Sequence, residues 1–183
     1  MTHPYRRYRT STTHWLRSDY NERPWLESVD NRVTNITRST WGTESQEAVQ
    51  VLRYEEGQYY NGHLDYTERA PYVKNKKAMM DAHGGYKNRM VTVFWYLSDV
   101  GVEDGGSTHF PRAGGLRHPT NNRGCEIDKG LHVYPSRGRG MMFYDLLPDG
   151  WGDPYSMHTA CPIKNGATKW AANKWVRNEP FRD

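Results

Sequence analysis

The 183-residue chain is long enough for one domain with a sizeable buried core. With 25% charged and 36% hydrophobic residues it is polar, but its composition is not that of a disordered chain. The formal net charge is +4, yet the basic residues are dispersed, so no nucleic acid partner is expected. No run approaches the roughly 20 apolar residues of a membrane span, and residues 1–6 hold no apolar signal region. We therefore expect a single domain over residues 1–183, without a membrane segment, either whole or part of a longer protein.

A helix is the first element that the sequence predicts, after about 20 polar and irregular residues. Pro24 suits the first turn of a helix. Apolar residues then recur at the spacing of one helical face: Leu26, Val29, Val33 and Ile36. We expect this stripe to face a core and the helix to end by Trp41-Gly42.

Strands dominate the rest of the chain. One is predicted over residues 48–54, followed by a turn at 55–58 and extended chain up to His63. Residues 67–88 indicate a long polar loop, and residues 90–97 a strand that is apolar on both faces and hence buried. Shorter strands are predicted near residues 106–110, 130–135, 139–145, 155–161 and 168–177. This order predicts a mainly β fold, a sandwich or jelly-roll barrel with one or two flanking N-terminal helices.

Three residues have the character of an iron site. His63 and Asp65 form a His-x-Asp pair, and His158 follows 95 residues later. Two imidazoles and one carboxylate leave half of an octahedral coordination sphere open, as in the facial triad of non-haem Fe(II) oxygenases. Taken alone, His63 and Asp65 also fit a hydrogen-bonded surface pair, so the rest of the sequence has to decide.

Cys125 and Cys161 are the two cysteines of the chain. They do not form a CxxC motif, which argues against a thioredoxin-like redox motif and a cysteine-rich zinc site. One disulfide or two free thiols both agree with the sequence.

Five segments, in order, resemble the motifs of the prolyl 4-hydroxylases, a family of Fe(II)/2-oxoglutarate dioxygenases. The segments are residues 52–66, 89–100, 105–111, 138–144 and 156–175, and Arg9-Thr10-Ser11 also fits the family. The resemblance therefore spans residues 9–177. It implies a double-stranded β-helix core of the jelly-roll, cupin-like type, with His63, Asp65 and His158 as iron ligands.

The resemblance also implies roles for further residues. Lys169 is expected to pair with the distal carboxylate of 2-oxoglutarate, Tyr54 to hydrogen-bond that carboxylate, and Thr92 to face the cosubstrate. Tyr60, Arg89 and Trp175 match positions near the peptide groove, and Arg89 is also the candidate for a catalytic role. Structural roles stay open, because Lys169 also fits a strand-edge lysine, Tyr54 a core tyrosine, and Arg89 and Tyr60 plain packing residues.

The sequence departs from the family pattern at two places in these motifs. Lys169 lies eleven residues after His158, one more than expected, and a small bulge would absorb the difference. Ser107 stands where an acidic residue is usual. Cys161 follows His158 by three residues, as in secretory relatives where a disulfide is plausible, and Cys125 is its only intrachain partner.

The function that the resemblance implies is hydroxylation of peptidyl proline at C4, with 2-oxoglutarate converted to succinate and carbon dioxide. A proline-rich or collagen-like peptide would be the partner, and ascorbate the accompanying reductant. Family resemblance suggests the endoplasmic reticulum or the secretory lumen, although the sequence holds no visible signal peptide. The alternatives are an oxygenase that acts on lysyl residues or free amino acids, and a peptide-binding module on an inactive oxygenase scaffold.

Overall fold

Two antiparallel sheets make up the fold in the computed structural model, which describes residues 8–68, 87–115, 125 and 130–180. The larger sheet has the order β1-β2-β9-β4-β7, and the smaller sheet has the order β3-β8-β5-β6. The strands of the larger sheet are β1 (Thr12–Leu16), β2 (Val49–Tyr54), β9 (Lys169–Arg177), β4 (Arg89–Tyr96) and β7 (Gly140–Tyr144). Those of the smaller sheet are β3 (Tyr60–His63), β8 (His158–Ala160), β5 (Thr108–Phe110) and β6 (Leu131–Val133).

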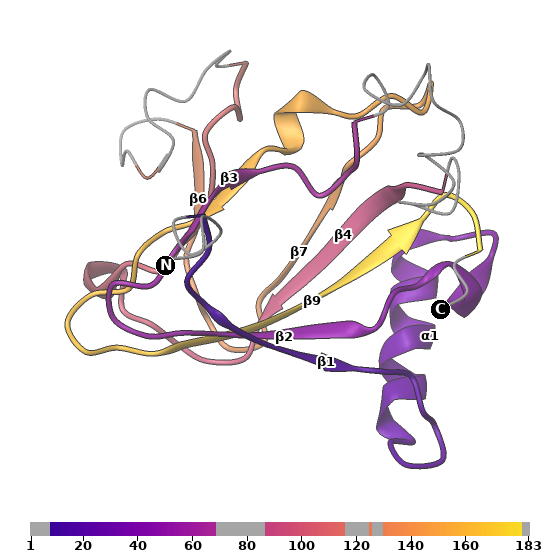
Figure 1. The fold of residues 1–183 in the computed structure, drawn as a ribbon, viewed down its shortest axis with the longest axis horizontal. Helices are drawn as coiled ribbons and strands as arrows, with labels where there is room; N and C mark the ends of the chain where they lie inside the picture. Colours follow the sequence, from indigo (N-terminus) through magenta and orange to yellow (C-terminus); the bar gives the residue numbers. More distant parts are fainter. Residues whose placement is uncertain (1–7, 69–86, 116–124, 126–129, 181–183) are drawn as a thin grey trace, which may run out of the picture.

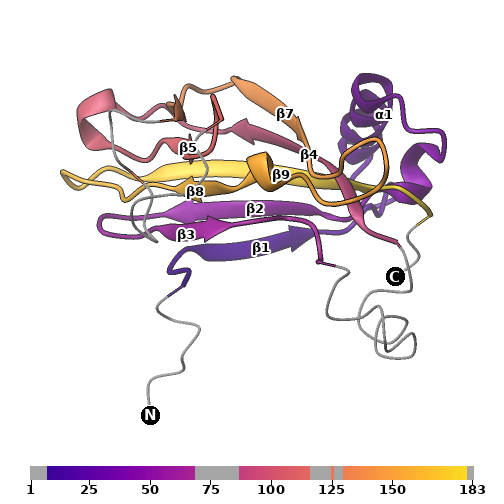
Figure 2. The same ribbon diagram turned by 90° about the horizontal axis from the view of Figure 1, so that it is seen from above.

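The larger sheet separates a helix from the smaller sheet. Figure 1 shows β1, β2, β9 and β4 running side by side, with α1 (Trp25–Thr37) on one side and β3 and β6 on the other. Figure 2 shows the strands from above, with α1 at one end of the molecule. Three short 3-10 helices complete the described elements: η2 (Gly42–Ser45), η4 (Val102–Asp104) and η5 (Pro154–Ser156).

The two faces of the larger sheet contact different parts of the protein because side chains alternate along each strand. On β4, Val91 and Val93 pack with Val33 of α1, and on β9 Ala172 packs with Leu26 of α1. The alternate residues of the same strands point to the other face, toward the smaller sheet. That inner face holds the cavity described below.

The predicted helix is confirmed in its position. Pro24 occupies the N-cap of α1, and Arg38 ends the helix in the left-handed conformation, with φ at 52°. Leu26 and Val33 are buried, but Ile36 is 54% exposed, so the prediction that it faces the core is wrong. Ile36 lines an open groove between α1 and β4 with Val93 and Trp95, so the sheet does not cover its side chain, although Thr37 of the same turn is buried.

The strands were predicted more accurately than the irregular segments. Strands lie in each of the eight regions predicted to be extended, and the mainly β, jelly-roll architecture is confirmed. The prediction that residues 1–20 are irregular is wrong over β1, and the strand expected from residue 155 starts at His158, because η5 precedes it. Most of the predicted 67–88 loop lies outside the described residues.

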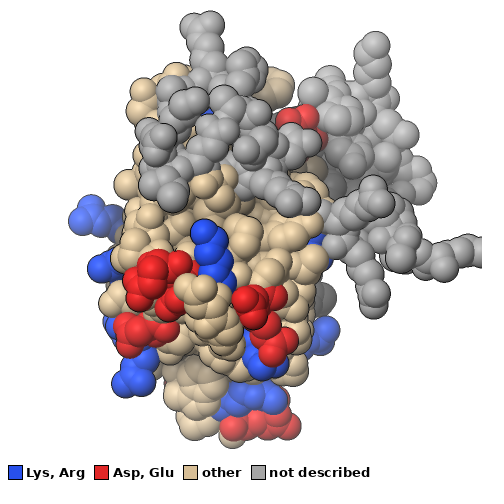
Figure 3. Space-filling view, turned by 90° about the vertical axis from the view of Figure 1, so that its left-hand side faces the viewer, with Lys and Arg blue, Asp and Glu red and all other residues tan. Residues whose placement is uncertain are grey.

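Basic and acidic side chains are mixed on the face that Figure 3 presents, where Lys and Arg lie beside Asp and Glu among uncharged residues. On this face, and among the described residues, charge of one sign does not form a continuous patch. None of the helices in the described ranges has the length and apolar character that crossing a membrane requires.

Candidate active site

The three predicted metal ligands lie together at the edge of the smaller sheet. His63 ends β3, His158 begins β8, and the two residues are directly paired across these strands. Asp65 follows two residues after His63, with Oδ1 at 3.5 Å from His63 Nε2 and Oδ2 at 3.7 Å from His158 Nε2. One ligand atom from each residue lies within 4.8 Å of the others. Strand pairing therefore joins residues that are 95 positions apart in the sequence.

Backbone carbonyls orient both imidazoles. His63 Nδ1 lies 2.9 Å from the carbonyl oxygen of Asn61, and His158 Nδ1 lies 2.9 Å from that of Ser156. With the proton on Nδ1, each ring presents the lone pair of Nε2 to the space between the three residues. Burial, followed by the neighbouring His158, lowers the pKa of His63 to about 3, so the ring is neutral at physiological pH. A neutral imidazole is the form that binds a metal.

Asp65 is held by two donors from the larger sheet. The Thr92 hydroxyl lies 2.8 Å and the Trp175 indole nitrogen 2.9 Å from Asp65 Oδ2, and Thr92 and Trp175 are direct partners across β4 and β9. Both contacts fall on one carboxylate oxygen, which leaves Oδ1 for other partners. Burial raises the pKa of Asp65, but the imidazoles of His158 and His63 and the Arg89 guanidinium outweigh it and lower the value to about 2.

Asp145 extends this network away from the metal ligands. Its Oδ2 also lies 2.8 Å from the Thr92 hydroxyl, which has only one proton to donate. Burial and the nearby charge of Asp65 raise the pKa of Asp145 well above its ordinary value. A protonated Asp145 donates to Thr92, and Thr92 donates to ionised Asp65, so each contact has a donor and an acceptor.

Lys169 and Tyr54 lie opposite each other in the larger sheet, on β9 and β2. Both side chains are buried, and the Lys169 ammonium lies 4.4 Å from the centre of the Tyr54 ring. The ammonium donates to the carbonyl oxygen of Gly106 at 2.7 Å. Burial is the only cause that lowers the pKa of Lys169, to about 7, so no carboxylate of the described residues compensates this charge.

One cavity of about 230 Å³ contains these groups. Every residue predicted to bind metal, cosubstrate or substrate lines it: Tyr54, Tyr60, His63, Asp65, Arg89, Thr92, His158, Lys169 and Trp175. Thr108 and Ala160 of the smaller sheet line its opposite wall. The cavity therefore lies between the two sheets, with the metal ligands and Lys169 both opening into it.

Aromatic side chains surround the metal ligands. The Tyr60 ring stacks on His63 with the ring centres 3.7 Å apart. The Arg89 guanidinium lies 3.5 Å from the centre of the Trp175 ring, and Glu47 accepts from it at 2.8 and 2.9 Å. This bidentate pair fixes Arg89 against the indole, and burial of the guanidinium is offset by Glu47 so that its pKa is raised.

Four residues of this site were assigned no role from the sequence, although Arg9 lies in a segment that fits the family. Arg9 and Trp15 line the cavity, Glu47 holds Arg89, and Asp145 continues the hydrogen bonds of Asp65. Arg9 and Trp15 are brought to the cavity by the pairing around β1, a strand that was not predicted. Alternation of Thr13 and Trp15 in an extended segment is the signal that could have identified the strand.

The extra residue between His158 and Lys169 does not disturb the position of Lys169. Asn165 and Gly166 adopt positive φ values of 55° and 71° in a turn before β9, and Lys169 still pairs directly with Tyr54 across β9 and β2. Ser107 lies beside His132, at 2.9 Å from Nδ1. Cys125 and Cys161 form a disulfide, which settles the alternative that the sequence left open.

The sequence model of the 2OG-Fe(II) oxygenase superfamily matches residues 49–177. The chain belongs to this superfamily. Among curated relatives, Prolyl 4-hydroxylase 5 of Arabidopsis thaliana is 36% identical over 179 residues, which cover 96% of this chain and 56% of that protein. Prolyl 4-hydroxylase 2 of the same plant is 38% identical over 78% of this chain and 46% of its own length. The chain thus spans about half the length of the curated relatives it matches.

Solved structures support the fold. The viral collagen prolyl hydroxylase of Paramecium Bursaria Chlorella virus-1, in complex with 2OG, gives a TM-score of 0.68 at 22% identity, covering 94% of this chain and 81% of that one. A Trichoplax adhaerens prolyl hydroxylase, in complex with a hypoxia inducible factor peptide fragment, gives 0.59 at 19% identity, with coverages of 94% and 64%. The jelly-roll fold of these oxygenases is therefore the fold of this chain.

Proposed function

We propose that this chain is a prolyl 4-hydroxylase domain, which hydroxylates peptidyl proline at C4 with dioxygen and 2-oxoglutarate and releases succinate and carbon dioxide. One observation carries the proposal. A single cavity contains a His-Asp-His group and, on its far wall, a buried lysine without a compensating carboxylate among the described residues. A metal and a small dianion are the two ligands that this arrangement would accept.

The donor set fits Fe(II). Two neutral imidazole nitrogens and one carboxylate oxygen would ligate the ion from one side and leave positions for other ligands. Thr92 and Trp175 would hold Asp65 Oδ2, so Oδ1 would be the metal-binding oxygen. Iron bound here with 2-oxoglutarate would supply the oxidation of a substrate C–H bond by dioxygen.

Lys169 and Tyr54 would hold the distal carboxylate of 2-oxoglutarate. The Lys169 ammonium is buried and lacks a compensating negative charge among the described residues. The side chain of Tyr54, which carries a hydroxyl, lies beside this ammonium. A carboxylate that enters the cavity would complete this pair and would keep Lys169 protonated. Thr92, which lines the same wall, would position Asp65 and border the cosubstrate.

The aromatic residues around the metal ligands would receive the peptide. Tyr60 and Trp175 place aromatic rings beside the metal ligands, on which a proline could pack. Arg89 lies over the Trp175 ring, with Nη1 3.5 Å from the backbone oxygen of Asp65. Arg89 would donate to a backbone carbonyl of the peptide and so place the proline at the metal, which is its proposed contribution to catalysis. A proline-rich or collagen-like peptide is the partner that this surface suits best.

The cellular setting is part of the proposal. The Cys125–Cys161 disulfide agrees with an oxidising compartment such as the endoplasmic reticulum or the secretory lumen. Ascorbate is proposed as the reductant that restores Fe(II) after turnover without substrate. Loss of activity over successive turnovers in its absence would be the sign of that role.

The direct test is succinate formation by protein loaded anaerobically with Fe(II), then given 2-oxoglutarate and oxygen, with and without a polyproline peptide. We expect the peptide to stimulate turnover and to gain one oxygen atom by mass spectrometry. His158→Ala should lose both signals, whereas His14→Ala, on the exposed side of β1, should keep them.

Other outcomes would redirect the proposal. Turnover that the peptide does not stimulate would support an oxygenase activity but not this substrate. A lysyl residue or a free amino acid would then be the candidate substrate. Peptide binding that needs neither iron nor 2-oxoglutarate, without turnover, would identify a binding module on an inactive scaffold.

A further inference from the structure

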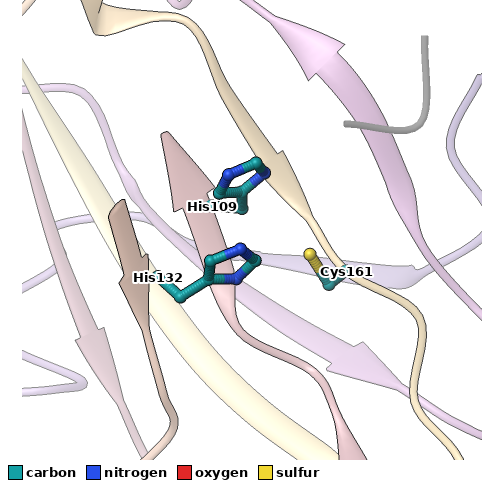
Figure 4. A group of neighbouring side chains, drawn as sticks. All are labelled: His109, His132 and Cys161. Carbon is teal, nitrogen blue, oxygen red and sulfur yellow. The ribbon is translucent and has the colours of Figure 1, made fainter. Parts of the chain in front are cut away.

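A second group of metal-binding side chains lies on the smaller sheet. His109 of β5 and His132 of β6 are directly paired, and their rings stack with centres 3.9 Å apart at 11°. Cys161 follows β8, the other neighbour of β5. One ligand atom from each of the three residues lies within 4.8 Å of the others. Figure 4 shows the imidazoles one above the other and the Cys161 sulfur beside them.

This group is separate from the cavity. Thr108 and Ala160 line the cavity, and side chains alternate along β5 and β8. His109 and Cys161, each one residue further along the chain, therefore point to the opposite face of the smaller sheet. His63, Asp65 and His158 use the inner face, so the two groups share strands but no space.

The surroundings favour a bound ion. His109 is 1% exposed and Cys161 5% exposed, and His132 is half-buried, so two of the three ligands are shielded from solvent while one side of the group remains accessible to an ion. The Ser107 hydroxyl lies 2.9 Å from His132 Nδ1, which fixes the ring and directs Nε2 away from Ser107. Metal-binding histidines commonly have such a partner on the other ring nitrogen.

The disulfide decides which ligands this group can offer. Cys125 is bonded to Cys161, and a disulfide sulfur carries no negative charge for a cation. Reduction by a dithiol transfers two electrons and two protons: the S–S bond breaks, two thiols form, and the dithiol closes to its own disulfide. Two cysteines then stand beside two histidines, which is a known ligand set of structural zinc.

We propose that His109, His132, Cys161 and Cys125 form a redox-controlled zinc site. In the reduced protein one Zn²⁺ binds the two imidazoles and two thiolates, and the thiol protons are released on binding. Tetrahedral zinc needs ligand atoms roughly 3.3–3.8 Å apart, so His109, His132 and Cys161, whose ligand atoms lie within 4.8 Å of one another, need side-chain shifts of only about 1 Å. Cys125, once released from the disulfide, moves further to supply the fourth ligand. In the oxidised protein the disulfide takes the place of the metal, and either form ties the end of β8 to Cys125.

Cobalt(II) is the probe for the first experiment, because a thiolate ligand gives it a near-ultraviolet charge-transfer band that imidazole and carboxylate do not. The iron site contains no sulfur, so metal bound there is silent in this band. The protein is reduced with a trialkylphosphine, which becomes a phosphine oxide by taking oxygen from water. We expect one equivalent of Co²⁺ to produce the band in reduced protein, Zn²⁺ to abolish it, and oxidised protein to show none.

Two variants make the test specific. His132→Gln keeps both cysteines and should weaken Zn²⁺ binding by about 100-fold or more, because a direct ligand is lost. Cys125→Ser leaves Cys161 as a thiolate without any reductant, so it should bind Co²⁺ through three protein ligands and show a weaker band. Unchanged affinity in His132→Gln would overturn the proposal, since the thiols alone would then account for binding.

Thermal unfolding provides a readout that does not depend on the spectrum. Zn²⁺ should raise the Tm of reduced protein by several degrees more than that of oxidised protein, because it binds only the folded reduced site. A reduced protein that circular dichroism shows to be unfolded with and without Zn²⁺ would contradict the site. So would a folded reduced protein that shows neither the band nor the added stability.

Discussion

The two faces of β9 each bury a lysine, and the two lysines differ in their partners. Lys174, on the side of α1, is fully buried and forms an ion pair with Asp30, which also accepts from Ser18 at 2.6 Å and Tyr20 at 2.9 Å. Lys169, on the cavity side, is also fully buried and donates to the backbone carbonyl of Gly106. Burial lowers the pKa of both ammonium groups, and Asp30 opposes this effect only for Lys174.

The difference distinguishes a structural charge from one that serves a ligand. A buried ion whose partner belongs to the same chain is satisfied in the folded protein. A buried ion that faces a cavity without such a partner costs folding free energy, which a bound anion would offset. Substitutions of Lys174 and Lys169 should separate these two roles.

Lys174→Met should produce the largest loss of stability. It leaves Asp30 as a buried carboxylate without its ammonium, a change that typically costs about 3–5 kcal/mol. Denaturant unfolding should show this loss, while the KM for 2-oxoglutarate in the remaining folded protein stays unchanged. A large change in that KM would mean that the two faces of β9 are not independent.

Lys169→Met should have the opposite profile. The free energy of unfolding should stay the same or rise, because an uncompensated buried ammonium is removed. The KM for 2-oxoglutarate should rise about 10- to 150-fold, which corresponds to the roughly 1.5–3 kcal/mol of a charge-assisted hydrogen bond. Steady-state succinate formation measures the KM, and a loss of stability without a change in KM would assign Lys169 to the core.

The pH dependence of cosubstrate binding should follow Lys169. Its pKa of about 7 in the free protein means that the ammonium is increasingly neutral above pH 7. A bound dianion favours the protonated form, so the Kd should be flat below about pH 7 and should then rise up to about tenfold per pH unit. Calorimetry in two buffers of different ionisation enthalpy should detect proton uptake on binding, and Lys169→Met should abolish it.

The linear sequence was sufficient to predict which residues meet in the site wherever those residues belong to a motif. His63, Asp65, His158 and Lys169 occupy motif positions, and the structure brings them to one cavity. Hydrophobic pattern also predicted the helix and most strands, since one face or both faces of each are buried. These features depend on local spacing, which can be read without knowing the fold.

The parts that depended on tertiary packing were not predicted. β1 is an edge strand with mixed polarity, so its sequence lacks a strong pattern, and the positions of Arg9 and Trp15 in the cavity were not predicted. Ile36 follows the helical repeat, but the repeat alone does not show which of its positions a neighbouring strand covers in the folded protein. Glu47 and Asp145 have no motif, because their roles depend on side chains that are 42 and 53 residues away in the chain, Arg89 and Thr92.

Asp145→Asn should have the smallest effect and the most specific pH signature. The raised pKa of Asp145 means that the folded protein holds this proton more tightly than the unfolded chain. Its contribution to stability is therefore full below the unfolded pKa of about 4 and is lost as pH rises through the folded value. An asparagine amide can donate to Thr92 at every pH and so preserves the hydrogen bond to Asp65 without that loss.

The Tm difference between Asp145→Asn and the parent protein should therefore grow as pH rises above about 4, in favour of the variant, and should level off once the pH passes the raised pKa of Asp145. Asp145→Leu is the matched control, because it has a similar size but cannot donate to Thr92. It should weaken Fe(II) binding, whereas Asp145→Asn should not. Equal Fe(II) binding by both variants would mean that Thr92 positions Asp65 without help from Asp145. The hydrogen bond between Asp145 and Thr92 would then make no contribution to the metal site.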